Sequence, residues 1–259
     1  MADSPIDILA IAAHRDDAEQ TCGGTLLKMA ALGHRTGILD LTRGEMGTRG
    51  TALDREHEAA DAARILKVSW RGALDIPDGR VENTFDNKLK VASVIRALRP
   101  RVVILPYWQG RHPDHYTCST LGYEACFLAG LTKLDVSPVR ADSVSLTLTT
   151  DNWQLTTESP HRPFKIVYAT LYYDIRPTFV VDISDQFEAR FQALMAYKSQ
   201  YIDQQAGSGL FPQHAEIRTR LETMARFYGL LAGVTYAEPF LQKEVGMVDD
   251  LAAIPVASM

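Results

Sequence analysis

The sequence predicts an α/β fold of the Rossmann-like type, with a mainly parallel central sheet and helices on both faces. Short apolar runs typical of buried strands alternate with stretches of helical periodicity through the first half of the chain. Gly33 and Pro100 each follow a helical stretch, at positions where such residues end helices. This alternation predicts a parallel sheet, because each helix carries the chain back to the start of the next strand.

The first half contains four strand-like and four helical segments. The predicted strands are Ile6–Ala13, Thr36–Leu41, Arg71–Ile76 and Val102–Leu105. The predicted helices are Thr25–Leu32, Arg55–Leu66, Asn87–Leu98 and Pro113–Leu131. The second helix is rich in Ala and Glu, and the fourth begins with Pro, which the first helical turn tolerates. Residues 42–50 form a Gly-rich polar loop, and Pro77-Asp78-Gly79 has the composition of a turn.

The second half is less regular. Ser143–Thr149 alternates hydroxyl and apolar residues, which is the period of a half-buried strand, and it lies in a mostly polar excursion over residues 132–163. The remaining predicted elements are the strands Ile166–Tyr173 and Thr178–Asp182 and the helices Phe187–Tyr201 and Ile217–Leu231. Residues 246–259 carry only weak structural signals, so we expect them to form a loose tail. Because no repeat or low-complexity linker occurs, we expect residues 1–259 to form a single domain.

Composition excludes several classes of function. The chain has 27 Lys and Arg against 32 Asp and Glu, so its formal net charge of −5 gives no basic surface for nucleic acid or an anionic membrane. Three cysteines, Cys22, Cys118 and Cys126, do not predict a disulfide framework. The apolar stretch Ile8–Ala13 is too short for a signal peptide or a membrane span. We therefore expect a soluble cytoplasmic protein.

Two polar clusters follow strand-like runs and point to chemistry. His14–Glu19 follows the first predicted strand, and His112–His115 follows the fourth. Ligands bind at the carboxyl ends of the strands in open α/β sheets, so we expect both clusters at one site. Each cluster alone has an ordinary alternative, which is to cap the next helix. Two such clusters at two strand ends favour a functional site.

His14, Asp17 and His115 are candidate metal ligands. Two imidazoles and one carboxylate suit Zn²⁺ and leave a fourth position open, although Fe²⁺, Mn²⁺ or Co²⁺ can use the same set. Asp16 is then available as a general base, and His112 can stabilise an oxyanion or pass a proton to a leaving group.

Asp114 can orient one of the imidazoles.

The sequence lacks Gly-x-Gly-x-x-Gly after the first strand and a Gly-Lys-Ser/Thr phosphate loop, which disfavours nucleotide binding. It also lacks Gly-x-Ser-x-Gly, which disfavours a serine hydrolase.

The two clusters resemble the motifs of the LmbE/PIG-L family of zinc-dependent N-acetyl-sugar deacetylases. That family has an Ala-His-Pro-Asp-Asp-Glu-like motif, matched by Ala13–Glu19, and a His-Pro-Asp-His-like motif, matched by His112–His115. Three further segments resemble the branch that deacetylates N-acetylglucosaminyl-malate in bacillithiol biosynthesis. They are Leu41–Gly50, Ala196–Tyr201 and Tyr236–Phe240. The resemblance covers most of the chain outside residues 132–163.

The resemblance implies a role for each site residue. His14, Asp17 and His115 match the zinc ligands, Asp16 the general base, and His112 the histidine that stabilises the tetrahedral intermediate, with Asp114 orienting it. Substrate-binding residues are expected at Arg55, Arg111, Arg49 and Glu45. A guanidinium suits a malate carboxylate because it can donate two parallel hydrogen bonds to it. The alternative is that each arginine forms an ordinary ion pair on the protein surface.

Arg15 departs from the family pattern, which has Pro at this position. Arg restores an N–H that Pro lacks and brings a positive charge near Asp16 in the sequence, which would favour the ionised carboxylate and weaken it as a base. The alternatives are that Arg15 points to solvent or binds an anionic substrate.

We therefore expect a metal-dependent hydrolase that removes acetate from an N-acetylglucosamine derivative, with N-acetylglucosaminyl-malate as the expected substrate. One alternative is a deacylase of another N-acyl sugar or a glycolipid precursor. Another is a relative that binds a sugar or metabolite without turnover. The resemblance also implies a homo-oligomer such as a hexamer, with no nucleic-acid or membrane partner.

Overall fold

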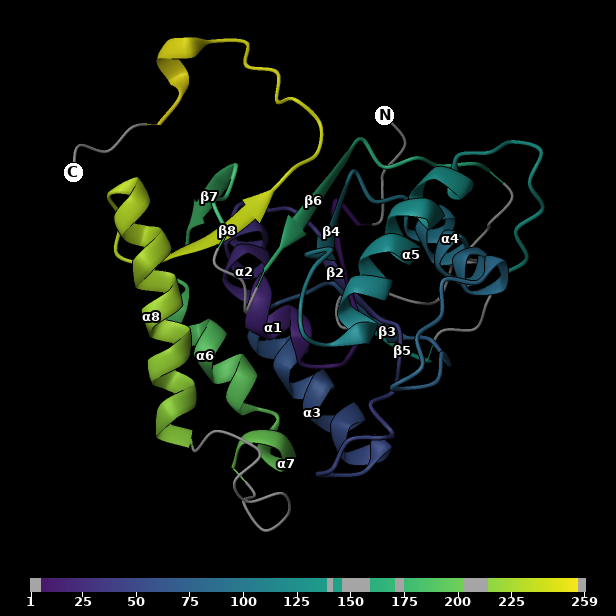
Figure 1. Cartoon of the computed structure of the whole chain (residues 1–259), viewed down its shortest axis with the longest axis horizontal. Helices are drawn as coiled ribbons and strands as arrows, with labels where there is room; N and C mark the ends of the chain where they lie inside the picture. The colour runs from purple at the N-terminus through teal and green to yellow at the C-terminus, as the bar shows by residue number, and fades with distance from the viewer. Residues whose placement is uncertain (1–5, 139–141, 146–158, 171–174, 203–213, 256–259) are drawn as a thin grey trace.

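The computed structural model describes residues 6–138, 142–145, 159–170, 175–202 and 214–255 (Figure 1). They include an eight-stranded sheet in the order β5-β3-β2-β1-β4-β6-β8-β7. The strands are β1 (Ile8–Ala12), β2 (Thr36–Asp40), β3 (Trp70–Ala73), β4 (Val102–Pro106), β5 (Asp142–Ser145), β6 (Lys165–Ala169), β7 (Phe179–Asp182) and β8 (Ala237–Leu241). The helices are α1 (Asp17–Thr21), α2 (Gly23–Ala31), α3 (Ala52–Ile65), α4 (Phe85–Leu98), α5 (Pro113–Ala129), α6 (Phe187–Met195), α7 (Lys198–Tyr201) and α8 (His214–Ala232).

The central part of the sheet is parallel and its edges are antiparallel. Strands β3, β2, β1, β4 and β6 all run in the same direction. Strand β5 pairs antiparallel with β3 at one edge, and β8 pairs antiparallel with both β6 and β7 at the other. The predicted α/β fold with a mainly parallel sheet is therefore confirmed.

Two hydrophobic cores cover the two faces of the sheet. Alternate residues of β1 enter different cores, with Leu9 and Ile11 on the side of α4 and α5, and Ala10 and Ala12 on the side of α2, α3 and α6. This alternation follows from the two-residue period of a strand. Because both faces are buried, most residues of the central strands are apolar, which is why these strands read as nearly continuous apolar runs in the sequence.

Side-chain caps fix the starts of two helices ahead of the predicted positions. The Thr51 hydroxyl accepts from the backbone N–H of Asp54, whose carboxylate accepts from the backbone N–H of Thr51, so α3 begins at Ala52 instead of Arg55. The Thr84 hydroxyl similarly accepts from the N–H of Asn87, and α4 begins at Phe85.

Three features differ from the expected elements. The predicted helix Phe187–Tyr201 is two helices, because Tyr197 leaves helical geometry and its side chain is fully buried. Helix α1 and strand β8 were not predicted from periodicity. Strand β8 contains Pro and a charged residue, Glu238, which is buried because its carboxylate accepts from the N–H groups of Gly24 and Thr25 at the start of α2. Parts of two predicted strands, residues 146–149 and 171–173, lie outside the described residues.

The chain after β8 leads away from the sheet as the yellow segment of Figure 1 and carries a short 3-10 turn at Leu251–Ala253. In the part of the chain that the structure describes, the helices are too short or too polar for any of them to cross a bilayer.

Candidate metal centre and active site

The two polar clusters meet at the carboxyl ends of β1 and β4, which are neighbours in the sheet. His14 and Asp16 lie in the turn after β1, and Asp17 is the first residue of α1. His112 is the residue before α5, where its Nδ1 accepts from the N–H of Asp114 at 3.2 Å. The chain order reverses at β1, since β2 lies on one side and β4 on the other, so this edge is the topological switch point of the sheet.

His14, Asp17 and His115 converge tightly. His14 Nδ1 lies 3.4 Å from Asp17 Oδ2 and 3.3 Å from His115 Nε2. His115 Nε2 lies 3.1 Å from Asp17 Oδ1. Ligand atoms at the usual zinc distances in a tetrahedral arrangement are about 3.3 Å apart. The spacing of the three side chains is therefore suited to a small metal ion held by one atom of each.

The second nitrogen of His14 is held by carboxylates. Its Nε2 lies 3.1 Å from Asp78 Oδ1 and 3.3 Å from Asp114 Oδ2. Asp114 also accepts from the N–H groups of Gly79 and Val81 at 2.8 and 3.2 Å. The carboxylate of Asp114 therefore orients His14, whereas the family resemblance implied that it orients His112. A carboxylate on the far nitrogen of an imidazole is the usual support for a metal-binding histidine.

Asp78 is a site residue that sequence reasoning missed. The Pro77-Asp78-Gly79 segment indicated only a turn, since nothing in its spacing links it to a ligand cluster. The fold brings this turn against His14. The only sequence signal was an acidic residue in a turn after a strand of the same sheet, and that signal is not specific.

The site carries an excess of negative charge. Burial would lower the pKa of His14, but Asp17 and the hydrogen bonds to Asp114 and Asp78 raise it to about 12. Burial would raise the pKa of Asp17, but His115 and His14 hold it well below its usual range. The pKa of His115 is also raised, because Asp17 outweighs the effect of burial. These carboxylates favour any cation at the site, whether an imidazolium or a metal ion.

Asp16 takes no part in this cluster. Its Oδ1 accepts from Arg55 Nη2 at 2.9 Å, and its Oδ2 accepts from the Tyr201 hydroxyl and from Gln20 Nε2, the latter at 3.3 Å. Asp16 precedes α1 but makes no capping hydrogen bond. Its carboxylate is therefore fixed on the cleft side of the turn by donors from three different helices. Tyr201 is a second site residue to which sequence reasoning gave no role.

The expected substrate-binding residues have different environments. Arg55 is 5% exposed and pairs with Asp16, and Arg49 is 7% exposed and donates to the carbonyl oxygen of Gln200 at 2.9 Å. Glu45 Oε1 accepts from the N–H of Asp78 at 2.8 Å, so it holds the turn that contacts His14. Arg111 is exposed beside the centre.

The buried Arg15 side chain faces away from the site. It is 3% exposed, and its nearest carboxylate is that of Glu56, at 3.9 Å. Burial lowers the pKa of its guanidinium, while the carboxylates of Asp40 and Glu56 oppose that change. The Arg15 side chain therefore does not point to solvent, and the guanidinium that pairs with Asp16 is that of Arg55.

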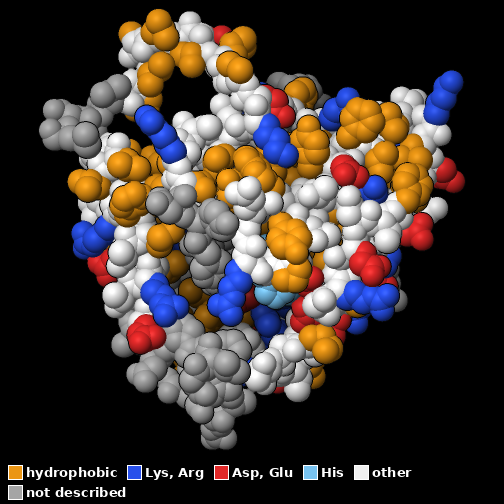
Figure 2. Space-filling model, in the orientation of Figure 1, with side chains coloured by type: hydrophobic (Ala, Val, Ile, Leu, Met, Phe, Trp, Pro, Cys, Tyr) orange, Lys and Arg blue, Asp and Glu red, His pale blue; other side chains and the backbone are white. Residues whose placement is uncertain are grey.

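A cleft of about 1130 Å³ opens over the cluster. His14, Asp16, Asp17 and His115 lie on one side of it, and α8 provides the opposite side. Figure 2 shows a histidine side chain in a hollow of this face, next to acidic and basic side chains. The α8 residues that line the cleft include Thr219, Arg220, Thr223, Met224 and Phe227. The cleft thus offers polar and apolar contacts to a ligand larger than a single small group.

Residues 9–126 match the family model PIG-L, GlcNAc-PI de-N-acetylase. A diacetylchitobiose deacetylase of Thermococcus kodakarensis is 32% identical over 244 residues, which cover 89% of this chain and 80% of the relative. The chain belongs to the PIG-L family of deacetylases.

Solved structures share the fold. A conserved protein of Thermus thermophilus has a TM-score of 0.76 at 38% identity, with 94% of this chain and 98% of that chain covered. The N,N'-diacetylchitobiose deacetylase of Pyrococcus horikoshii has a TM-score of 0.71 at 24% identity, with 90% and 82% covered, and it shows the same fold.

Proposed function

We propose that the protein is a zinc-dependent deacetylase that releases acetate from an N-acetylglucosamine derivative. One observation supports this most strongly: the His14, Asp17 and His115 set opens into the same cleft as Asp16 and His112. The activity named for the Thermococcus kodakarensis relative, which deacetylates an N-acetylglucosamine disaccharide, supports the sugar class.

His14, Asp17 and His115 would hold the Zn²⁺ ion, which would supply Lewis acidity toward the acetamide carbonyl and toward water. Asp16 accepts the proton of the attacking water. Its carboxylate suits this task because Arg55 and Tyr201 fix its orientation while leaving it in the cleft.

His112 stabilises the developing oxyanion. Because its Nδ1 accepts from the N–H of Asp114, the imidazole proton lies on Nε2, which is free to donate. Burial and the nearby charges of His14 and His115 lower the pKa of His112, so the ring donates as a neutral imidazole. The C–N bond then breaks, the water oxygen leaves in acetate, and the amine takes the proton that Asp16 had accepted.

N-Acetylglucosaminyl-malate is the proposed substrate, and Arg111 is the proposed contact for its carboxylates. This proposal is supported by the exposure of Arg111 next to His112 and by the resemblance of residues 41–50 and 196–201 to the malate-conjugate branch. A second candidate is diacetylchitobiose, which the Thermococcus relative and the volume of the cleft favour.

The test is acetate release by the zinc-loaded protein from N-acetylglucosaminyl-malate, diacetylchitobiose and free N-acetylglucosamine. We expect the malate conjugate to be preferred, and we expect Arg111→Gln to raise KM for that substrate alone. Preference for diacetylchitobiose, with no effect of Arg111→Gln, would assign the second candidate. No acetate from any of them, with one zinc per chain bound, would refute the deacetylase proposal.

We also propose that the protein forms a homo-oligomer. Val245, Met247 and Leu251 are 96%, 87% and 81% exposed on the segment that leads away from the sheet, and such grouped apolar side chains favour association. Sedimentation equilibrium of the wild type and of a Val245→Glu, Met247→Glu variant tests this, and a monomeric wild type would contradict it.

A further inference from the structure

A charged side chain, that of Arg71, lies on a buried strand of the sheet. Arg71 belongs to β3 and pairs with Ile38 of the parallel strand β2, and it is only 3% exposed. A guanidinium costs free energy to bury unless its N–H groups find acceptors. The mechanism proposed above does not use Arg71, although its side chain reaches the turn that carries His14 and Asp16.

Two buried carboxylates hold the guanidinium of Arg71. Its Nε and Nη2 donate to the two oxygens of Asp40, the last residue of β2, at 2.8 and 3.1 Å. Its Nη1 donates to Oε1 of Glu19, on α1, at 2.5 Å. Asp40 and Glu19 are at most 1% exposed. Since paired hydrogen bonds to a carboxylate fix the plane of a guanidinium, the direction of the second N–H of Nη2 is fixed as well.

This second N–H points at the backbone of the turn after β1. It donates to the carbonyl oxygen of Arg15. The hydroxyl of Tyr197, which lies between α6 and α7 and is fully buried, donates to the same oxygen. One carbonyl therefore accepts hydrogen bonds from two buried side chains, which are 56 and 182 positions away in the sequence.

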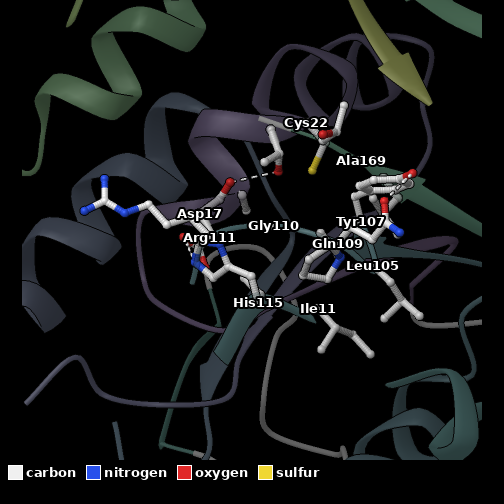
Figure 3. Close-up of a pocket in the computed structure, with 17 residues that line it drawn as sticks. Ile11, Asp17, Cys22, Leu105, Tyr107, Gln109, Gly110, Arg111, His115 and Ala169 are labelled. Atoms are coloured by element: carbon white, nitrogen blue, oxygen red, sulfur yellow. Dashed lines mark hydrogen bonds and ion pairs between the residues drawn. The ribbon is translucent and has the colours of Figure 1, made fainter. Parts of the chain in front are cut away.

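The held carbonyl lies between two residues whose side chains take different directions. It belongs to the peptide that joins Arg15 to Asp16, and His14 is one residue earlier. The His14 ring joins the set of Asp17 and His115, which lie next to each other in Figure 3. The Asp16 carboxylate takes no part in that set. Because a peptide is planar, fixing its oxygen limits the rotation of the backbone on either side of it.

The segment that holds this backbone also holds the side chain of Asp16. Tyr201 follows Tyr197 by four residues, and its hydroxyl donates to Asp16 Oδ2. Tyr197 therefore fixes the backbone beside the proposed base, and Tyr201 fixes the carboxylate. The Tyr197 hydroxyl oxygen also lies 3.3 Å from Glu19 Oε1, so Tyr197 and Arg71 belong to one network.

Charges buried in this way are a poor means of stabilising a fold. The attraction within a buried ion pair often does no more than offset the cost of removing its charges from water, and apolar side chains of similar size often stabilise a protein as well. An apolar side chain at position 71, however, has no N–H to donate to the carbonyl of Arg15. Stability alone therefore does not require an arginine here, whereas holding the carbonyl does require a donor.

We propose that Arg71 and Tyr197 are positioning residues, which hold the Arg15 peptide so that His14 stays in the ligand set and Asp16 stays in the cleft. The proposal rests on the function proposed above, in which His14 is a zinc ligand and Asp16 is the base. Neither Arg71 nor Tyr197 is among the described residues that line the cleft. Their loss should therefore change zinc affinity and kcat but not KM.

The first experiment compares Arg71→Lys with Arg96→Lys. Lysine keeps the positive charge but donates from a single atom, so it cannot reproduce the hydrogen bonds of the guanidinium to Asp40, Glu19 and the carbonyl together. Arg96 is the matched control, because it is also 3% exposed and also donates to backbone carbonyls. Those carbonyls lie at the end of α5 and in the residues after it, away from the turn.

Zinc affinity is measured on the chelator-treated proteins by competition with a dye of known affinity, and kcat and KM are measured at saturating zinc. Loss of a group that orients a metal ligand costs about 10–100-fold in metal affinity or activity. We therefore expect Arg71→Lys to weaken zinc binding and to lower kcat, each by about 10–100-fold, with KM unchanged. Both lysine variants should lose thermal stability, but Arg96→Lys should keep the zinc affinity and kcat of the wild type.

The second experiment removes a single oxygen atom. Tyr197→Phe keeps the ring in the core and removes only the hydroxyl, so it tests the proposal even where Arg71→Lys does not fold. We expect zinc affinity and kcat to fall about tenfold each. Tyr168→Phe is the matched control, because Tyr168 is also fully buried and its hydroxyl has no hydrogen-bond partner in the described part of the chain.

Unchanged zinc affinity in the folded Arg71→Lys and Tyr197→Phe proteins would overturn the role toward His14, and unchanged kcat would overturn the role toward Asp16. Equal losses in Arg96→Lys and Tyr168→Phe would show that any damage to the core has these effects, and would overturn both roles. Failure of the deacetylase function gives a different pattern. In that case the wild type binds zinc and releases no acetate, while the zinc affinities of the variants still support or reject the positioning role.

Discussion

Replacing Asp16 with Asn separates the proposed base from the proposed ligand beside it. The amide has nearly the shape of the carboxylate but accepts no proton from water. Asp16 lies outside the His14, Asp17 and His115 set, whereas Asp17 contacts both histidines. We therefore expect Asp16→Asn to keep the metal and lose turnover, and Asp17→Asn to lose the metal.

The structure sets the expected magnitudes. A positioned general base contributes about 10²–10⁴-fold to the rate, which is about 2.7–5.5 kcal/mol of barrier. Asp16→Asn also loses a charge-assisted hydrogen bond from Arg55, whose guanidinium is buried, at a cost of about 1.5–3 kcal/mol of stability. For a domain of similar size, that loss lowers Tm by about 3–12 °C.

The assay combines acetate release with metal analysis of the same samples, and circular dichroism below the new Tm establishes that the variants are folded. The expected result is an Asp16→Asn protein with one metal per chain and kcat reduced by about 10²–10⁴. An Asp16→Asn protein without metal, together with a metal-loaded Asp17→Asn protein, would mean that the two aspartates have the opposite roles. Wild-type turnover in Asp16→Asn would refute the base assignment altogether.

Three further predictions concern His112, the pH dependence of zinc binding and the packing of Gly24. His112→Ala should lower kcat by about 10²–10³ with the metal retained, as metal analysis and steady-state kinetics will test; an unchanged kcat would remove His112 from the mechanism. Because carboxylates raise the pKa of His14 to about 12, that ring is protonated at pH 7 without metal, and Zn²⁺ must displace the proton. Apparent zinc affinity should therefore rise at least about tenfold per pH unit from pH 6 to 8, and more where His115, whose pKa is also raised, still carries a proton. Calorimetry in buffers of different ionisation enthalpy should detect the released protons, and a pH-independent affinity would contradict this. Gly24→Ala should lower the free energy of unfolding by about 1–3 kcal/mol, because its Cβ would meet the side chains of Ile183 and Glu238 at 2.8 and 2.9 Å. Gly23→Ala, whose nearest contact would be 3.3 Å, is the control in urea unfolding, and equal losses would contradict the packing argument.

The sequence by itself determined the sheet and the position of the candidate site. Strand and helix periodicities are local, so the alternation over residues 6–131 predicted that β1, β2, β3 and β4 run parallel, as they do in the structure. His14 and His115 could be placed near each other for the same reason, since each follows a strand and parallel strands end at one edge. Strand β8 was not predicted, because a buried Glu and a Pro interrupt its apolar pattern.

Only the tertiary structure decided which residues surround the two clusters. Asp78 contacts His14 from a turn after β3, and Tyr201 contacts Asp16 across 185 residues of sequence. Nothing local marks either residue, because such contacts depend on how a turn and a short helix pack after the sheet has formed. The same packing turned Arg15 into the protein interior and paired Arg55 with Asp16. Sequence patterns report the period of a single element, whereas the direction of a side chain between elements is set by the packing of all of them together.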